Sequence, residues 1–338
     1  MLRDAHHSRT PVIPRGAGTK AGWGNPPPPA ATVVSTQCLN RVVEHAWADL
    51  TATVEAGCTI SELQRRLAEH DQRLAVDPLW PEQATVGGVL SANDTGVLRF
   101  RYGGLRDLII GATIALADGT LAKTGGKVVK NVAGYDLSKL VTGAMGTLGV
   151  ITSATFRLHP LPRLTRTVTV PASGLPQMQT MLGKILDAQI VPVALQVRSE
   201  NGACHIDVMF EGIEEGIVSQ VESLRQFAPA LSGDPAVWQR LDAAAKISVL
   251  PSQIAEALEG LKGCAVIQGT GIGWVQAANL PALRQKIERL GGSLVLMKRQ
   301  ENMDAWGTPG DALPLMRAIK KQFDPRNILN PGVFVGGI

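Results

Sequence analysis

Pro14-Arg15-Gly16-Ala17-Gly18-Thr19-Lys20 is the stretch that decides the fold, because its glycines follow a short apolar strand, Val12-Ile13. Glycine permits positive φ and close approach of other groups, so successive backbone N–H groups can converge on phosphate oxygens. Thr19 can add a hydroxyl, and Arg15 or Lys20 can supply positive charge. A glycine cluster on its own can also be a tight turn. Its interpretation therefore depends on the rest of the chain.

Two well-known phosphate-binding motifs do not fit this loop. A Rossmann fingerprint needs G-x-G-x-x-G at the start of a helix. The glycines within 16–22 are one residue out of that register, and four prolines at 26–29 follow in place of a helix. A Walker A loop needs G-x-x-x-x-G-K-[ST]. Gly126-Lys127-Val128 lacks the hydroxyl residue, and Leu121 stands where the first glycine belongs.

Three more glycine-rich segments follow in the same half of the chain. They run over residues 84–96, 125–137 and 143–150. The first contains the adjacent glycines Gly87 and Gly88 among small polar residues, a composition that lets a planar ligand pass close to the backbone. Turns alone do not require so many glycines. We therefore predict one ligand site assembled from several loops.

Composition sets limits on the function. The 338 residues predict two domains, and 45% hydrophobic with 18% charged residues is typical of a globular protein with a substantial core. The net charge of +4 includes no Lys/Arg block and aromatics are only 4%, which argues against nucleic-acid binding. Cys38, Cys58, Cys204 and Cys264 form no C-x-x-C pair. We expect buried reduced thiols, no iron–sulfur or zinc site, and no metal in this chain.

The N-terminus shows no targeting signal. Residues 1–7 lack the apolar region of a secretory signal, and no window approaches the ~18 consecutive apolar residues of a membrane span. We expect a cytoplasmic protein that reaches the inner face of the plasma membrane only through partners.

The pattern of elements predicts an α+β protein. In the first half we expect strands at 12–13, 32–35, 49–54, 108–117, 120–123 and 149–158, and a helix over 136–142. Thr59-Ile60-Ser61-Glu62 fits a capping box in which Thr59 caps a helix and Glu62 reaches back. In the second half we expect helices at 176–189, 214–227, 252–261 and 280–290, and strands at 193–198, 204–210, 246–250, 264–268, 272–277 and 293–297. The predicted domains are 1–162, 163–300 with an antiparallel sheet covered by helices, and a C-terminal segment, 301–338.

Five segments together resemble one known superfamily. They are Arg15-Gly16-x-Gly18-Thr19, Ala84-Thr85-Val86-Gly87-Gly88, Lys130-Asn131-Val132-Ala133-Gly134-Tyr135-Asp136-Leu137, Gly146-Thr147-Leu148-Gly149-Val150 and Asp324-Pro325-x4-Asn330-Pro331-Gly332. This set resembles the FAD domain of the vanillyl-alcohol-oxidase type, also called PCMH-type, followed by an antiparallel α+β cap. Within the superfamily the chain most resembles the FAD-binding subunits of glycolate oxidase, or glycolate dehydrogenase. The resemblance covers nearly all of 12–162 and the tail, whereas 165–300 match loosely.

The resemblance implies a set of FAD-binding residues. The diphosphate would be cradled by Arg15, Gly16, Ala17, Gly18, Thr19 and Lys20. The diphosphate and isoalloxazine would be flanked by Thr85, Gly87, Gly88, Ser91 and Asn93. The adenine side would be lined by Gly146, Gly149 and Val150, and Asn330 would return near the flavin edge. Relatives with covalent flavin carry a histidine after the first glycine loop. Thr19 and Lys20 stand at this place, so the resemblance implies noncovalent FAD. It also implies that the C-terminal segment returns to the FAD site.

No catalytic base can be assigned from the sequence. Stand-alone 2-hydroxyacid dehydrogenases of this superfamily use a paired-histidine metal site and a further histidine in the cap. Here the histidines are His6, His7, His45, His70, His159 and His205, with no H-x-H pair. His205, alone in the cap region, is interpreted as structural. Other candidates are Arg101, Tyr102 and Arg106 for a carboxylate, Lys127 or Lys130 for reduced flavin, and Tyr135 near the ring; each has a surface or packing alternative.

The resemblance leads to one functional hypothesis and two rivals. The first is an FAD-carrying subunit of a glycolate dehydrogenase complex, with a homologous catalytic flavoprotein subunit and an iron–sulfur subunit as partners and a small 2-hydroxy acid as substrate. The second is a stand-alone FAD dehydrogenase for D-lactate or another 2-hydroxy acid. The third is a non-catalytic assembly subunit. Flavin content and turnover by the isolated chain distinguish them.

Overall fold

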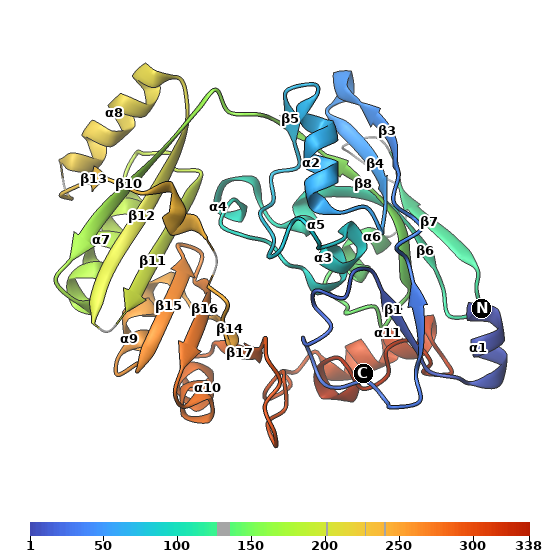
Figure 1. The fold of residues 1–338 in the computed structure, drawn as a ribbon. Helices are drawn as coiled ribbons and strands as arrows, with labels where there is room; N and C mark the ends of the chain where they lie inside the picture. Colours follow the sequence, from blue (N-terminus) through green and yellow to red (C-terminus); the bar gives the residue numbers. More distant parts are fainter. Residues whose placement is uncertain (127–135, 201, 227, 240) are drawn as a thin grey trace. The chain divides into compact units, whose positions relative to one another are not determined.

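The structure, a computed structural model, describes residues 1–126, 136–200, 202–226, 228–239 and 241–338. The chain forms two compact units (Figure 1). The first contains residues 1–96, 103–161 and 308–338, and the second contains 97–102 and 162–307. Helices and antiparallel sheets occur in both, which confirms the predicted α+β class. The predicted domain limits stay a prediction.

The first unit is built on an antiparallel sheet of order β3-β4-β8-β6-β7. Its strands are β1 (Val12–Arg15), β2 (Thr32–Ser35), β3 (Val42–Ala46), β4 (Thr51–Glu55), β5 (Gln72–Arg73), β6 (Ile109–Ala115), β7 (Leu121–Gly125), β8 (Val150–Arg157) and β9 (His159–Pro160). Its helices are α1 (Leu2–Ser8), η1 (Trp47–Asp49), α2 (Ile60–Ala68), α3 (Val86–Ala92), α5 (Leu105–Leu108), α6 (Leu137–Val141), α11 (Leu313–Phe323) and η4 (Val335–Gly337). Two small sheets complete it, parallel β1–β2 and antiparallel β5–β9.

Helix α2 shows how sequence dictates local structure here. Ile60, Leu63 and Leu67 recur at helical spacing and are buried in the core that they form with the sheet. The Thr59 hydroxyl accepts from the backbone N–H of Glu62 at 3.2 Å, which confirms the predicted cap. The reciprocal half of the capping box was wrong. The Glu62 carboxylate bonds the guanidinium groups of Arg65 and Arg66 instead, and this pairing lowers its pKa to about 2.

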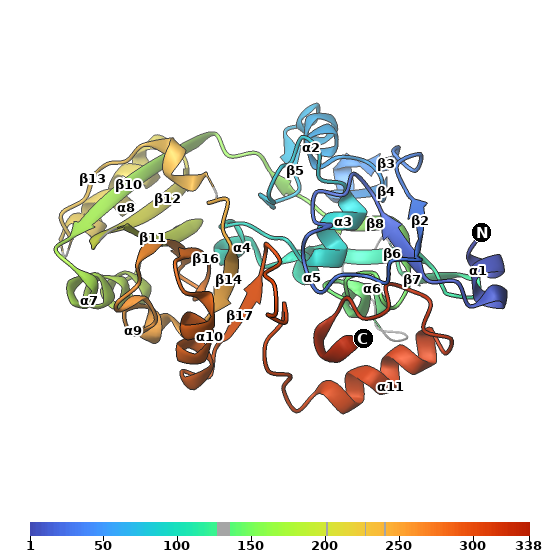
Figure 2. The same ribbon diagram turned by 60° about the horizontal axis from the view of Figure 1, so that its bottom comes forward.

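The second unit contains an antiparallel sheet of order β13-β10-β12-β11-β15-β16-β14-β17 (Figure 2). Its strands are β10 (Leu164–Ala172), β11 (Ala194–Glu200), β12 (Ala203–Gly212), β13 (Leu231–Ser232), β14 (Ala245–Ser248), β15 (Gly263–Gln268), β16 (Ile272–Ala277) and β17 (Ser293–Leu296). Its helices are α4 (Arg99–Tyr102), α7 (Leu175–Asp187), α8 (Glu214–Arg225), η2 (Pro235–Trp238), η3 (Pro251–Gln253), α9 (Ile254–Leu258) and α10 (Leu280–Arg289).

The two faces of this sheet differ in polarity. Val168, Leu195 and Val208 face the same side in cross-strand register and pack with buried residues of α7, α8, α9 and α10 in one core. Residues one position along each strand point to the opposite face, where Thr169 and Asp207 lie in register. This alternation is the pattern of a sheet covered by helices on one side.

The cysteines correct one expectation. All four are free, as predicted, and Cys58 and Cys204 are buried while Cys264 is half-buried. Cys38 is exposed, so the prediction of burial was wrong for it. Burial raises the pKa of the Cys58 thiol to about 11, which makes this group a poor nucleophile at neutral pH. In the described part of the chain, no helix is both long enough and apolar enough to cross a bilayer.

Candidate functional site

A pocket of about 70 Å³ in the first unit brings together segments that are far apart in the sequence. It is lined by the end of β1 with the first glycine loop, the residue after β2, helix α3, the loop before β8 with the start of that strand, and the C-terminal tail. The lining residues are Pro14, Arg15, Gly16, Thr36, Gly87, Gly88, Ser91, Met145, Gly146, Gly149, Val150, Ile151 and Asn330. The sequence-predicted residues Arg15, Gly16, Gly87, Gly88, Ser91, Gly146, Gly149, Val150 and Asn330 are therefore gathered around one space. We call this space the glycine pocket.

The first glycine loop begins after Arg15, the last residue of β1, and its Gly16 lies against Thr85, the residue before α3. β1 pairs in parallel with β2, and Arg15 is exposed at the rim. A side chain at position 16 would overlap the hydroxyl of Thr85, which is buried before α3. Glycine at 16 is thus required by close approach of the two loops.

Helix α3 also packs closely against Ala56, the residue that follows β4. The N–H of Gly87 donates to the carbonyl of Ala56 at 2.8 Å, and a Cβ on Gly87 would lie 2.9 Å from the Cβ of Ala56. Asn93 ends the helix in the left-handed conformation, with φ 47°. This position is the C-cap, so Asn93 serves the helix end and lies outside the pocket lining.

The loop before β8 is attached to α3 and to the tail. The N–H of Met145 donates to the carbonyl of Ser91 at 2.9 Å. Gly146 has φ 72°, and a Cβ there would lie 3.2 Å from Nδ2 of Asn330. A side chain on Gly149 would overlap Ile114 of β6. These contacts explain why this turn is rich in glycine.

The C-terminal tail extends the small sheet formed by β1 and β2. The N–H of Val12 donates to the carbonyl of Ile328 at 2.7 Å, and the N–H of Asn330 donates to the carbonyl of Val12 at 2.9 Å. Asp324 accepts from the N–H groups of Ile328 and Leu329 at 3.0 and 2.7 Å. The turn-rich end of the chain is therefore an ordered strand-like extension beside β1.

A buried ion pair connects the tail to the loop before β8. The Lys320 ammonium lies 2.7 Å from the Asp324 carboxylate and donates to the carbonyls of Thr147 and Leu329 at 2.9 and 2.8 Å. Both side chains are almost fully buried. Burial lowers the pKa of Lys320, and the neighbouring Asp324 opposes that shift.

Lys20 is placed differently from the rest of the first loop. Its ammonium is buried 3.2 Å from the Asp94 carboxylate and lies 5.5 and 5.7 Å from the ring centroids of Trp23 and Trp80. Its charge therefore faces Asp94 within the protein. Ala17, Gly18 and Thr19 also lie outside the pocket lining, and Gly18, with φ 78°, begins a turn. Thr85 lies beneath Gly16 and outside the lining as well.

Comparison with known families decides what this site belongs to. The family described as FAD binding domain matches residues 1–125, and the C-terminal domain of FAD linked oxidases matches 296–334. This chain carries the FAD-binding domain of the FAD-linked oxidases. FAD is its cofactor, as predicted, and the PCMH-type architecture is confirmed.

Three curated relatives are informative about length. Glycolate oxidase subunit GlcD of Bacillus subtilis is 33% identical over 58% of this chain and 42% of that protein. D-lactate dehydrogenase of Archaeoglobus fulgidus is 31% identical over 64% of this chain and 52% of that protein. Glycolate oxidase subunit GlcE of Escherichia coli is 27% identical over 98% of this chain and 95% of that protein. The chain thus spans about half the length of the first two relatives and nearly all of the third.

A solved structure shows the same fold. An alkyldihydroxyacetonephosphate synthase has a TM-score of 0.70 at 18% sequence identity, covering 98% of this chain and 74% of that chain. Identity at this level shows a common fold and no more.

The residues of the glycine pocket fit FAD. Glycines at 16, 87, 88 and 146 leave backbone within reach of a ligand, and Arg15 adds positive charge at the rim. Asn330 presents a buried side-chain oxygen without a hydrogen-bond partner, which the hydroxyl or amine groups of FAD can satisfy.

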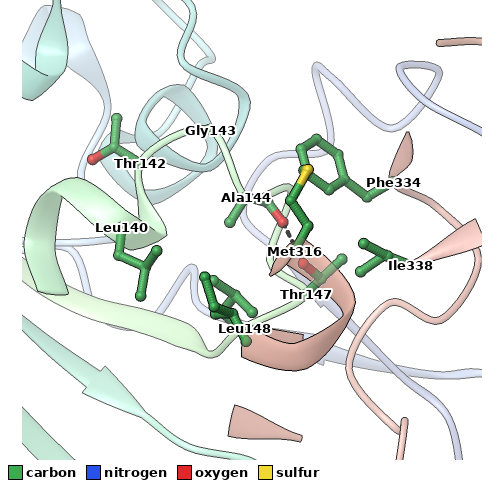
Figure 3. A pocket seen from close by; sticks show the side chains of 10 residues that line it. Leu140, Thr142, Gly143, Ala144, Thr147, Leu148, Met316, Phe334 and Ile338 are labelled. Atoms are coloured by element: carbon green, nitrogen blue, oxygen red, sulfur yellow. Dashed lines mark hydrogen bonds between the residues drawn. The ribbon is translucent and has the colours of Figure 1, made fainter. Parts of the chain in front are cut away.

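A second pocket, mostly apolar and of about 160 Å³, is lined in part by the loop before β8 (Figure 3). Figure 3 shows Met316, Phe334 and Ile338 across from Ala144 and Thr147. The hydroxyl of Thr147 donates to the carbonyl of Ala144 at 2.7 Å. The hydroxyl of Thr142 likewise donates to the carbonyl of Ser138 at 2.8 Å, so both side-chain hydroxyls of the lining already have partners within the protein. The pocket is therefore better suited to apolar packing than to binding a polar ligand.

None of the other described sequence candidates is among the lining residues of the glycine pocket. Among its described lining residues there is no histidine. His205 is half-buried on β12, and Arg101 and Arg106 are exposed. The hydroxyl of Tyr102 donates to the Glu211 carboxylate at 2.8 Å within the second unit. Lys127, Lys130 and Tyr135 lie outside the described residues.

Sequence reasoning missed a polar cluster in the second unit. Asp207 of β12 is fully buried and accepts from Thr169 at 2.9 Å and Gln196 at 3.0 Å, while Arg198 bonds both carboxylate oxygens at 2.6 and 3.0 Å. Alternation along β11 and β12 was the signal, because polar residues at every second position of two neighbouring strands share a face. No described group of three or more His, Cys, Asp or Glu residues could hold a metal ion.

Proposed function

We propose that this chain is the FAD-carrying subunit of a glycolate dehydrogenase complex, which oxidises glycolate to glyoxylate. The observation that supports this most directly is coverage. Glycolate oxidase subunit GlcE of Escherichia coli aligns with 98% of this chain and with 95% of its own length. This correspondence over nearly the whole of both proteins supports a role as a subunit of the same kind.

The proposed cofactor site is the glycine pocket with its surrounding loops. Arg15 and Gly16, with the adjoining loop of Ala17, Gly18 and Thr19, would hold the diphosphate, and Gly87, Gly88 and Ser91 would flank it. Gly146, Gly149 and Val150 would line the adenosine half. Lys20, Thr85 and Asn93 would support these loops from behind, because each is engaged in protein contacts.

The chemistry of the reaction limits what this chain does alone. Oxidation of glycolate removes two electrons and two protons, and FAD supplies the two-electron acceptor. The described residues offer no metal-binding cluster and no histidine at the pocket to take the hydroxyl proton. We therefore propose a homologous catalytic flavoprotein subunit for substrate oxidation and an iron–sulfur subunit that passes electrons onward. Any contact with a membrane would be made through these partners.

We predict that FAD is bound without a covalent bond, because Thr19 and Lys20 stand where covalent relatives carry a histidine. Acid precipitation of the purified yellow protein should release all of the flavin into the supernatant. Protein from which FAD was first removed by mild denaturation and dialysis serves as the control, and should regain the absorbance when FAD is added. Flavin that stays with the precipitate would contradict the prediction.

The isolated FAD-loaded chain should reduce its flavin with glycolate at least 100-fold more slowly than the assembled complex, since general-base help is worth about 10²–10⁴-fold. The measurement is anaerobic mixing with glycolate or D-lactate while the flavin absorbance is followed. Rapid bleaching without a partner would overturn the subunit proposal in favour of a stand-alone 2-hydroxyacid dehydrogenase, the activity named for the Archaeoglobus relative. Folded chain that binds no FAD would favour an assembly role.

A further inference from the structure

The carboxamide of Asn330 has one satisfied and one unsatisfied end. Its Nδ2 donates to the carbonyl of Met145 at 2.7 Å, which fixes the direction of the amide, since the reversed amide would set two oxygens against each other. Its Oδ1 is buried and accepts no hydrogen bond. Buried acceptors in folded proteins are almost always paired. This oxygen therefore marks a place for a donor that comes from outside the chain.

The position of this oxygen is fixed by the backbone around it. Asn330 has φ 42°, a left-handed conformation that asparagine tolerates better than most residues. Its N–H is bonded to Val12, and the preceding Leu329 is held by Asp324. The side chain is about nine-tenths buried and lines the glycine pocket together with Gly146. Little conformational freedom remains to be lost when a ligand binds.

We propose that Asn330 positions FAD by accepting a hydrogen bond, through Oδ1, from the adenosine half of the cofactor. The inference rests on the proposed FAD site, in which Gly146, Gly149 and Val150 line that half. Adenosine carries suitable donors, namely its ribose hydroxyls and its exocyclic amine. Asn330 lies directly beside the loop before β8, because its Nδ2 donates to the carbonyl of Met145 and a Cβ on Gly146 would lie 3.2 Å from the same nitrogen. The expected place of Asn330 thus moves from the flavin edge to the opposite end of the cofactor.

The first test compares ligands on the flavin-free chain. In the variant Asn330→Gly, glycine accepts the left-handed backbone without strain. We expect the Kd for FAD and for ADP to rise about tenfold, and the Kd for FMN, which lacks adenosine, to stay unchanged. The matched control is Asn327→Gly, at an exposed residue with φ 52°, which should change none of the three.

A second measurement separates the hydrogen bond from loosening of the loop, because Asn330→Gly also removes the contact with Met145. ADP is compared with 2′-deoxy-ADP, 3′-deoxy-ADP and inosine diphosphate, each lacking one donor. One analogue should bind the natural chain about tenfold more weakly than ADP, and Asn330→Gly should no longer distinguish that analogue from ADP. Unchanged FAD affinity in the variant, a loss confined to FMN, or undiminished discrimination of every analogue would overturn the inference. A natural chain without affinity for FAD would instead overturn the proposed function.

Discussion

Replacing Gly16 by alanine should weaken FAD binding by roughly 10- to 100-fold. The added methyl group would overlap the Thr85 hydroxyl, and Thr85 is buried, with its Cβ and Cγ2 also within 3.1 Å of the new atom. The first glycine loop and α3 must then separate. Overpacking of this kind costs about 1–3 kcal/mol, and every 1.4 kcal/mol is tenfold in affinity. The measurement is a fluorescence titration of the flavin-free variant with FAD.

Two further variants make this result interpretable. Gly183 lies inside α7 with no atom near its missing side chain, so Gly183→Ala should leave FAD affinity unchanged. Adding Thr85→Ala to the Gly16 variant removes the overlapping hydroxyl and should recover part of the affinity, which a double-mutant cycle can measure. If Gly16→Ala binds FAD as tightly as the natural chain, the first loop is not part of the site.

Local signals in the sequence predicted most elements correctly. The strands at 32–35 and 272–277 have the predicted bounds, and Asp118-Gly119 forms the turn between β6 and β7. Such elements are specified by neighbours in sequence, namely turn residues and alternating apolar positions. Strands β3 and β10 and helix α11 were nevertheless missed. Two of these carry such cues: β10 contains the β-branched run Thr167-Val168-Thr169-Val170, and α11 begins at Leu313-Pro314, with proline in its first turn.

Contacts between distant segments were beyond the reach of sequence patterns. Lys20 looked like a phosphate ligand because it follows a glycine loop, yet its ammonium faces Asp94, which lies 74 positions further along (94 minus 20). Local propensity contains no information on such pairings, since they depend on how the loops pack. The identities of Gly16 and Gly146 were recognised as special from the sequence. The reason for each, a neighbouring Thr85 or Asn330, required the structure.

Replacing Lys320 by methionine should lower the free energy of unfolding of the first unit by about 3–5 kcal/mol, the usual cost of leaving one partner of a buried ion pair alone. Methionine fills a similar volume, so the change isolates the loss of charge and of three hydrogen bonds, to Asp324, Thr147 and Leu329. Asp324 would keep its two backbone donors but lose its counter-charge. Urea unfolding measures the global effect.

The same variant should also loosen the tail, because Lys320 connects it to the loop before β8. We expect faster amide hydrogen exchange over residues 324–330 and weaker retention of FAD, since Asn330 and Gly146 lie at that junction. The matched control is Lys321→Met, one position along α11 and exposed, for which surface substitutions predict a change within about 0.5 kcal/mol. Equal stability of the two variants would show that the buried pair contributes nothing, and that the tail is held by its other hydrogen bonds, such as those to Val12 and Met145.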